Sequence, residues 1–200
     1  MKLLHTTDLH FNKQWFKWIQ SQESSFDIFC ISGDLLESRK EESLQEQIAW
    51  ITSWVKGFSK PLFICSGNHD IEEFENEDWL CKIESENYYC DNTKGTIDSL
   101  KIGCCAYLDA EYIEFYDCDI LVTHLPPTNT KTATHIKSDE DWGDKDLTRV
   151  LKNRLISPKI ILCGHMHSPT QTIDSIENTT IYNTGVKKGA TIPNHHIINL

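Results

Sequence analysis

The chain has 200 residues, of which 30 are acidic and 19 basic, so its formal charge is −11 and its pI about 5.2. This balance argues against a general polyanion binder, because nucleic-acid affinity comes largely from basic contacts to phosphates. No run of 18 apolar residues and no signal-peptide pattern occurs, so we expect neither a membrane span nor secretion. One domain over residues 1–200, with a full hydrophobic core, is predicted.

Eight cysteines are scattered along the chain without a C-x-x-C pair. Cys30, Cys65 and Cys163 lie inside apolar runs, where a cysteine behaves as a small hydrophobic residue. In the absence of a secretion signal, this pattern predicts eight free thiols, a reduced protein and a cytoplasmic location.

Strands and helices are predicted to alternate in the first third of the chain. The three apolar runs of strand length are residues 3–4, 26–31 and 61–65. Asn12 can cap a helix between the first two runs, and Ser43 with Glu46 forms a possible capping box for a second helix. In that second helix apolar residues recur with a period near 3.6. Such alternation is typical of a parallel sheet in an α/β fold.

The rest of the chain is predicted to contain shorter strands, one helix and two polar loops. Strands are expected at residues 87–90, 96–100, 101–107, 119–123, 159–163, 170–173, 180–183 and 196–199, the first three of them antiparallel. The acidic segment 71–79 is expected on the surface. The long polar segment 125–143 is expected to be functional or disordered. Asp144 should cap a helix that reaches Leu155 and stops before Pro158.

Metal-capable side chains follow five of the predicted strands. In chain order they are Asp8 and His10, Asp34, Asn68 and His69, His124, and His165 and His167. An isolated D-x-H is more often a capped turn with a surface histidine. The carboxyl ends of strands in open α/β sheets, however, meet at one functional edge. The repeated placement therefore predicts one metal centre, with glycines 33, 67 and 164 allowing tight turns beside it.

Five short motifs carry a family resemblance. D-x-H, G-D, G-N-H-D, T-H-x-P-P and G-H-x-H occur in this order between Asp8 and His167. In this set the chain resembles the calcineurin-like metallophosphoesterases, and within them the small phosphodiesterase-type members. The resemblance implies an α/β fold, a four-layer α-β-β-α sandwich in which helices flank two mixed β-sheets. It also implies a dinuclear metal-dependent phosphoesterase that hydrolyses a phosphodiester or a phosphomonoester.

The same resemblance implies a role for each motif residue. Asp8, His10 and His167 would bind one divalent metal ion, Asn68, His124 and His165 would bind a second, and Asp34 would bridge the two. His69 would be the general acid that protonates the leaving group after attack by a metal-bridging hydroxide. Oxygen and imidazole ligands together suit manganese, iron, zinc, nickel or cobalt, and manganese is the favoured cofactor.

Three positions depart from the motifs of the family. Phe11 stands where a glycine often follows D-x-H, and Thr184 replaces a usual proline in the sequence YNTG. Glu37 stands three residues after Asp34, where the protein phosphatase branch has an aspartate. We predict two alternatives for Glu37: it is a further catalytic residue that orients His69, or it only begins an exposed acidic run.

Two other classes of function stay open. The repair-nuclease branch shares G-N-H-D and G-H-x-H, but the acidic charge without a basic stripe argues against a nucleic-acid partner. The other alternative is a non-catalytic interaction protein on the same fold, against which the complete ligand set and His69 argue. The expected partner is a small phosphoester, and no membrane is expected. Outside the motifs, His135 is the histidine expected nearest to a substrate, and Lys13 and Arg39 are potential phosphate contacts.

Overall fold

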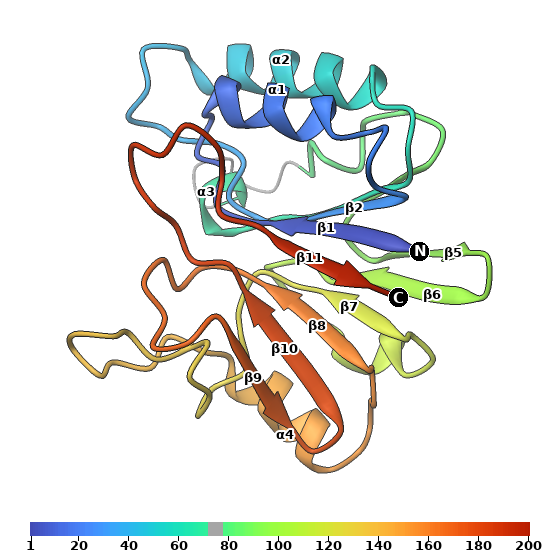
Figure 1. Ribbon diagram of the computed structural model, residues 1–200, viewed down its shortest axis with the longest axis vertical. Helices are drawn as coiled ribbons and strands as arrows, with labels where there is room; N and C mark the ends of the chain where they lie inside the picture. Colours follow the sequence, from blue (N-terminus) through green and yellow to red (C-terminus); the bar gives the residue numbers. More distant parts are fainter. Residues whose placement is uncertain (72–77) are drawn as a thin grey trace.

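The computed structural model describes residues 1–71 and 78–200, and it has the four layers that the resemblance implied (Figure 1). The first sheet contains β11 (His196–Asn199), β1 (Lys2–Thr6), β2 (Ile28–Ser32), β3 (Leu62–Cys65) and β4 (Tyr88–Tyr89), in that order. Strands β1 to β4 run parallel, and β11 pairs with β1 in the antiparallel direction. Most of the acidic segment predicted at 71–79 lies outside the described residues.

The second sheet is also mixed. Its order is β5 (Thr93–Ile97), β6 (Leu100–Cys104), β7 (Ile120–Val122), β8 (Ile160–Cys163), β10 (Thr179–Asn183) and β9 (Ile173–Ile176). The four central strands are parallel, whereas β5 and β9 at the two edges are antiparallel to their neighbours. Figure 1 shows that the parallel strands of both sheets have their carboxyl ends on the same side of the molecule, the left in that view.

Helices cover the outer faces of both sheets (Figure 1). Helices α1 (Lys13–Ser21) and α2 (Leu44–Lys56) lie over the first sheet, α4 (Lys145–Lys152) and the 3-10 helix η1 (Tyr112–Phe115) pack on the second, and the short α3 (Asn68–Ile71) follows β3. The three predicted helix caps are confirmed. Asn12 caps α1, and Ser43 with Glu46 forms a capping box on α2. Asp144 caps α4, where its side chain accepts a hydrogen bond from the backbone N–H of Leu147 at 2.7 Å.

The buried apolar side chains form three clusters that match the three interfaces between four layers. Strand β2 illustrates the reason. Because successive side chains of a strand point to opposite faces, Phe29 and Ile31 pack under α1 and α2, while Ile28 and Cys30 pack between the two sheets. A strand that is buried on both faces consists of a continuous apolar run, and for this reason these strands could be predicted from the sequence.

Four boundaries or directions predicted from the sequence are wrong. Strand β4 is parallel to β3, not antiparallel to its neighbour. Asp98 has a left-handed backbone (φ 55°) and turns the chain between β5 and β6, so residues 96–100 are not one strand. Residues 170–172 precede β9 because Thr170 donates a backbone hydrogen bond to Thr134 of the long loop. Helix α4 ends at Lys152, and Leu155 is half exposed.

The prediction of eight free thiols is also wrong. Cys81 and Cys90 form a disulfide, with their Cα atoms 5.7 Å apart. The other six cysteines are free and buried, among them Cys30, Cys65 and Cys163 of the apolar runs. Burial raises the pKa of the Cys30 and Cys163 thiols, so neither is a nucleophile at neutral pH.

None of the helices in the described ranges is long and apolar enough to cross a membrane.

Candidate metal centre

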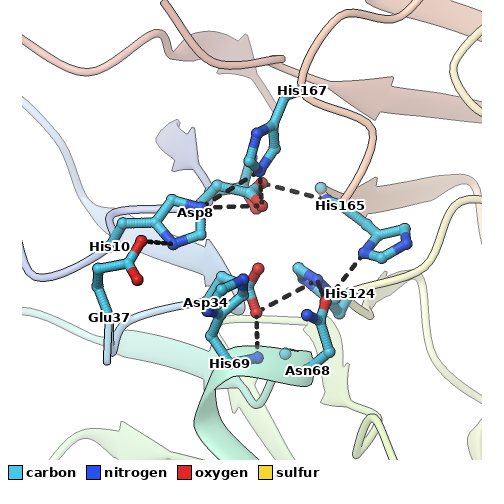
Figure 2. A network of polar contacts seen from close by, with 12 residues as sticks. Asp8, His10, Asp34, Glu37, Asn68, His69, His124, His165 and His167 are labelled. Carbon is cyan, nitrogen blue, oxygen red and sulfur yellow. Dashed lines mark hydrogen bonds and ion pairs between the residues drawn. The ribbon is translucent and has the colours of Figure 1, made fainter. Parts of the chain in front are cut away.

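The side chains predicted as metal ligands converge beyond the carboxyl ends of the strands, as Figure 2 shows. They come from the segments that follow β1, β2, β3, β7 and β8 of the two sheets; four of these segments are loops, and Asn68 is the first residue of α3. The nine residues that gather there are Asp8, His10, Asp34, Glu37, Asn68, His69, His124, His165 and His167. Residues as far as 159 positions apart in the chain therefore meet in one place.

One group of ligand atoms surrounds Asp8. Asp8 Oδ1 lies 3.0 Å from His167 Nε2 and 3.9 Å from His10 Nε2, and the two imidazole nitrogens are 3.2 Å apart. Asp8 Oδ2 accepts hydrogen bonds from the hydroxyl of Thr7 at 2.7 Å and from the backbone N–H of His165 at 3.1 Å. The second oxygen of this carboxylate is thus held by the protein, while the first faces the two histidines.

A second group surrounds Asn68. Asn68 Oδ1 lies 3.0 Å from His165 Nδ1 and 3.2 Å from His124 Nε2. On its other side, His124 Nδ1 is 2.8 Å from the backbone carbonyl of Ser32. Since a carbonyl only accepts, Nδ1 carries a proton, and in a neutral imidazole Nε2 then has a lone pair directed at Asn68. Such a contact to the outer ring nitrogen is typical of metal-binding histidines.

Asp34 lies between the two groups. Its Oδ1 is 3.4 Å from His124 Nε2 of the second group and accepts the backbone N–H of His69 at 2.9 Å. It also belongs to the first group, because ligand atoms of Asp8, His10, Asp34 and His167 all lie within 4.8 Å of one another. A carboxylate in this position can contact cations on both sides.

The donor set fits divalent cations. The amide oxygen of Asn68 lies 3.2 Å from Nε2 of His124, and a carboxylate oxygen of Asp34 lies 3.4 Å from the same nitrogen. An amide oxygen and an ionised carboxylate are both acceptors and cannot donate to the Nε2 lone pair, so a cation would satisfy the three groups together. Oxygen and imidazole donors without a thiolate suit first-row transition metals.

Burial shifts the pKa values of several of these groups. It lowers the pKa of His10 and of His165 to about 4, so both imidazoles are neutral at pH 7. Burial opposes ionisation of Asp8, but the hydrogen bonds from His167 and Thr7 and the charges of His124 and His167 together outweigh it and hold the pKa of Asp8 below its usual range. The hydrogen bond to Asp8 raises the pKa of His167. Burial and the charge of Asp8 raise the pKa of Asp34 well above its usual range.

The backbone at the site is strained. Asp8, His10, Phe11, Asp34 and His165 all have φ between +42° and +63°, a region that non-glycine residues rarely occupy. Such strain costs about 1–3 kcal/mol per residue and clusters at functional sites. At Phe11 the left-handed conformation explains why a glycine often follows D-x-H in the family. Phe11 keeps this conformation with its side chain buried in the core, where its ring meets that of Trp50 of α2.

Two glycines allow the loops to approach the ligands. A Cβ on Gly67 would overlap Oδ1 of Asp34, and a Cβ on Gly164 would overlap the hydroxyl of Thr7 and lie 2.6 Å from Oδ2 of Asp8. Any side chain at position 67 would displace the carboxylate of Asp34, and any at position 164 would displace Thr7 and the carboxylate of Asp8. These glycines therefore lie beside a crowded site, as their positions in the sequence indicated.

Two buried residues that position the ligand loops were given no role by the sequence. The first is Asp70. Its Oδ1 accepts the backbone N–H groups of Leu35 and Leu36, and its Oδ2 accepts that of Gly67, at 2.8–3.0 Å. Burial and the charge of Asp34 raise the pKa of Asp70 to about 7. The one signal in the sequence was the position of Asp70 in G-N-H-D.

Asn183, noted only for its place in the YNTG sequence, is the second such residue. It is fully buried at the end of β10, and its Nδ2 lies within 2.9–3.2 Å of the carbonyls of Thr132, Gly164 and Met166. It thereby joins the long loop 125–143 to the G-H-x-H loop.

Glu37 lies at the edge of the site, beside His10. Its Oε2 is 3.8 Å from His10 Nδ1, a buried ring nitrogen without a hydrogen-bond partner among the described residues. Ligand atoms of His10, Glu37 and His69 also lie within 4.8 Å of one another, so Glu37 is near both histidines. Its side chain is 18% exposed, which places it inside the cleft and not in an open acidic run.

Two cavities flank the ligands. One, of about 300 Å³, is lined by Asp34, Asn68, His69, His165 and His167 together with residues 135, 138, 140, 142, 166 and 168. The other, of about 360 Å³, contains His10, His69 and His167 with the basic residues Arg39, Lys40 and Lys188. His69 lines both, and His135 lines the first, as its place in the long loop suggested.

Of the two potential phosphate contacts, only one lies at the cavities. Lys13 pairs with Glu42 at 2.7 Å, while Arg39 lines the second cavity.

The comparisons with known proteins agree with this geometry. The family model for calcineurin-like phosphoesterases matches residues 1–169, and the chain belongs to that family. It is therefore assigned to the hydrolases of phosphoesters, and the family implies divalent metal ions at the centre described above.

Individual relatives are distant in sequence. A curated relative, the 3',5'-cyclic adenosine monophosphate phosphodiesterase CpdA of Haemophilus influenzae, is 25% identical over 84% of this chain and 70% of its own length. The solved structure of TT1561 from Thermus thermophilus superimposes with a TM-score of 0.67 at 14% identity, over 92% of this chain and 88% of that one. A novel archaeal phosphodiesterase gives a TM-score of 0.57 at 16% identity, over 100% and 93%. The two structures show a shared fold.

Proposed function

We propose that this chain is a phosphoesterase that works with two divalent metal ions. One would be held by Asp8, His10 and His167, the other by Asn68, His124 and His165, with Asp34 between them. The observation that carries the proposal is the meeting of acceptor atoms in two groups on either side of Asp34. Cations are the simplest partners for lone pairs that face one another in this way.

The chemistry divides between the metals and the protein. When bound, two divalent cations supply positive charge for the phosphoryl oxygens and activate a water molecule for attack. The chain orients the ligands through Thr7 and Ser32, which hold Asp8 and His124. His69 is the proposed general acid, since it lines both cavities and its backbone N–H is tied to Asp34. A proton from its ring would neutralise the leaving alkoxide.

Several finer points belong to the same proposal. Manganese is the favoured metal because the ligands are oxygen and imidazole groups. A small phosphoester is the favoured substrate, because the formal charge of −11 opposes a nucleic-acid polyanion. The name of the curated relative adds a cyclic nucleotide to the diesters worth testing. A cytoplasmic location stays a prediction, and the Cys81–Cys90 disulfide argues against it, because disulfides are rare in reducing compartments.

The test measures metal content and turnover together. After loading with manganese and gel filtration, we expect about two ions per chain by elemental analysis, and chelation should abolish turnover. The substrates are bis(p-nitrophenyl) phosphate, p-nitrophenyl phosphate, cyclic adenosine monophosphate and single-stranded DNA. We expect turnover of a small ester and none of DNA. A chain that binds no transition metal would contradict the proposal, and preferential cleavage of DNA would favour the nuclease alternative.

Glu37 allows a sharper experiment, because a side chain that holds His10 and one that orients His69 have different consequences when Glu37 is replaced. Metal-binding histidines usually donate their outer N–H to a carboxylate or carbonyl, and loss of that partner typically weakens metal affinity about 10–100-fold. Glu37 faces His10 Nδ1, so we expect Glu37→Gln to weaken manganese binding by about this factor, with all substrates slowed until manganese is raised. If instead only esters with poor leaving groups slow down, at unchanged metal affinity, Glu37 orients His69.

A further inference from the structure

Trp142 is an exposed tryptophan at the edge of the metal centre. Its side chain is 52% exposed, whereas Trp15, Trp54 and Trp79 are 4–5% exposed and belong to the core. It stands near the end of the long loop 125–143, the segment whose role the sequence left open. A large aromatic surface left in water has an energetic cost, and exposed aromatic groups in clefts often serve recognition.

The loop holds Trp142 in a fixed place. The carboxylate of Asp141 accepts hydrogen bonds from Thr128, Asn129 and Gly143 at 2.6–2.8 Å. The backbone N–H of Trp142 itself donates to the carbonyl of Ala133 at 3.1 Å. An aromatic ring on a rigid support binds a ligand with little loss of conformational entropy. The loop is thus ordered by its own polar contacts, not by burial of the tryptophan.

The position of the ring relative to the ligands is favourable for a substrate. The Trp142 ring lies 5.7 Å, centroid to centroid, from the ring of His165. Trp142 lines the same cavity of about 300 Å³ as Asp34, Asn68 and His69. A phosphoryl group at the metal centre would therefore carry one of its substituents along the face of Trp142.

The remaining wall of this cavity is polar. It includes His135, Ser138 and Glu140, of which Ser138 donates to Glu140 Oε2 at 3.1 Å and contacts His135 Nδ1 at 3.0 Å. A carboxylate at this position repels a second phosphate but can accept an N–H from a heterocycle. The basic residues Arg39, Lys40 and Lys188 line the other cavity. The substituent expected beside Trp142 is therefore planar, uncharged and rich in N–H groups.

We infer that Trp142 is a stacking platform for the nucleobase of a nucleotide substrate, which makes it a specificity-determining residue. The inference rests on the proposed function, because the phosphoryl group must be anchored at the metal centre. Stacking of a base on an aromatic side chain typically changes affinity roughly 5–150-fold, and it tolerates different bases.

The test compares two ligands that differ only by the base. Calorimetry would measure the binding of adenosine 5'-monophosphate and of ribose 5-phosphate to the manganese-loaded protein. We expect Trp142→Ala to weaken binding of the nucleotide by about 10-fold and to leave ribose 5-phosphate and the manganese content unchanged. Trp142→Phe should restore most of the affinity. Tyr116→Ala is the matched control, since Tyr116 is 68% exposed but packs beside Lys94 after η1.

The outcomes separate this inference from the proposed function. Equal nucleotide affinity in Trp142→Ala and the native protein would overturn the stacking role and leave the metal centre intact. Equal weakening of both ligands would also overturn it, because the residue would then act through the structure of the site. If neither ligand binds the native protein in the presence of manganese, the proposed function fails, and the role of Trp142 fails with it.

Discussion

Replacing His69 with Ala is expected to lower turnover by about 10²–10⁴-fold, the usual effect of losing a general acid. Manganese content should not change, because the ring of His69 is not among the proposed ligands. The loss should be larger for a methyl or nucleoside ester than for a p-nitrophenyl ester, since nitrophenolate leaves without a proton. Steady-state kinetics and elemental analysis on the same preparations measure both quantities.

Asp34→Asn is the contrasting variant. Asp34 lies between the two groups of ligand atoms, so removal of its charge should weaken metal binding on both sides. Manganese stoichiometry should fall, and every substrate should slow to a similar degree. Should His69→Ala empty a metal site instead, His69 would be a ligand and its assignment as general acid would be wrong.

Replacing Asp70 with Ala is expected to give a large loss of stability. The substitution leaves the buried N–H groups of Leu35, Leu36 and Gly67 without acceptors, and each such group costs about 1–3 kcal/mol. Relief of the buried carboxyl, whose pKa is raised by burial and by Asp34, offsets part of this cost. We therefore expect a net loss of about 3 kcal/mol in the free energy of unfolding, measured by urea denaturation.

Two further variants make this measurement specific. Asp70→Asn keeps the oxygen that serves Leu35 and Leu36 but can place an amino group against the N–H of Gly67, so it should cost less than Asp70→Ala. Asp146→Ala removes a carboxylate that is 72% exposed and pairs with Arg149 on the surface, and should change stability by less than about 1 kcal/mol. A loss as small in Asp70→Ala as in Asp146→Ala would show that Asp70 does not hold the ligand loops.

The secondary structure was predicted well where interactions between residues close in the sequence determine it. The strands buried on both faces appear as apolar runs, and the caps at Asn12, Ser43 and Asp144 depend on residues within one turn of the helix. The errors occur where contacts with distant segments of the chain determine the boundary or the direction of a strand. Thr170 and Gln171 donate backbone hydrogen bonds to Thr134 and Lys131 of the long loop and so do not begin β9. The direction of β4 depends on its pairing with β3, which is distant in the chain.

The Cys81–Cys90 disulfide is a second feature that the sequence did not predict. Cys81 and Cys90 are separated by nine positions, and nothing in their spacing distinguishes them from the other six cysteines. A disulfide requires Cα atoms about 4.4–6.8 Å apart, a condition that only the folded chain can meet or fail. The burial of Cys30, Cys65 and Cys163, by contrast, was predictable because apolar neighbours determine burial in a strand.

The family, the alternation of strands and helices, and the identities of the metal-capable residues could all be read from the amino-acid sequence, because each depends on short motifs and on periodicity. How those residues face one another became clear from the folded chain alone. The approach of Asn68 and Asp34 to His124, the position of Glu37 beside His10 and the exposure of Trp142 all depend on contacts between segments far apart in the chain. Such contacts are set by the packing of two sheets, for which a local pattern carries no information.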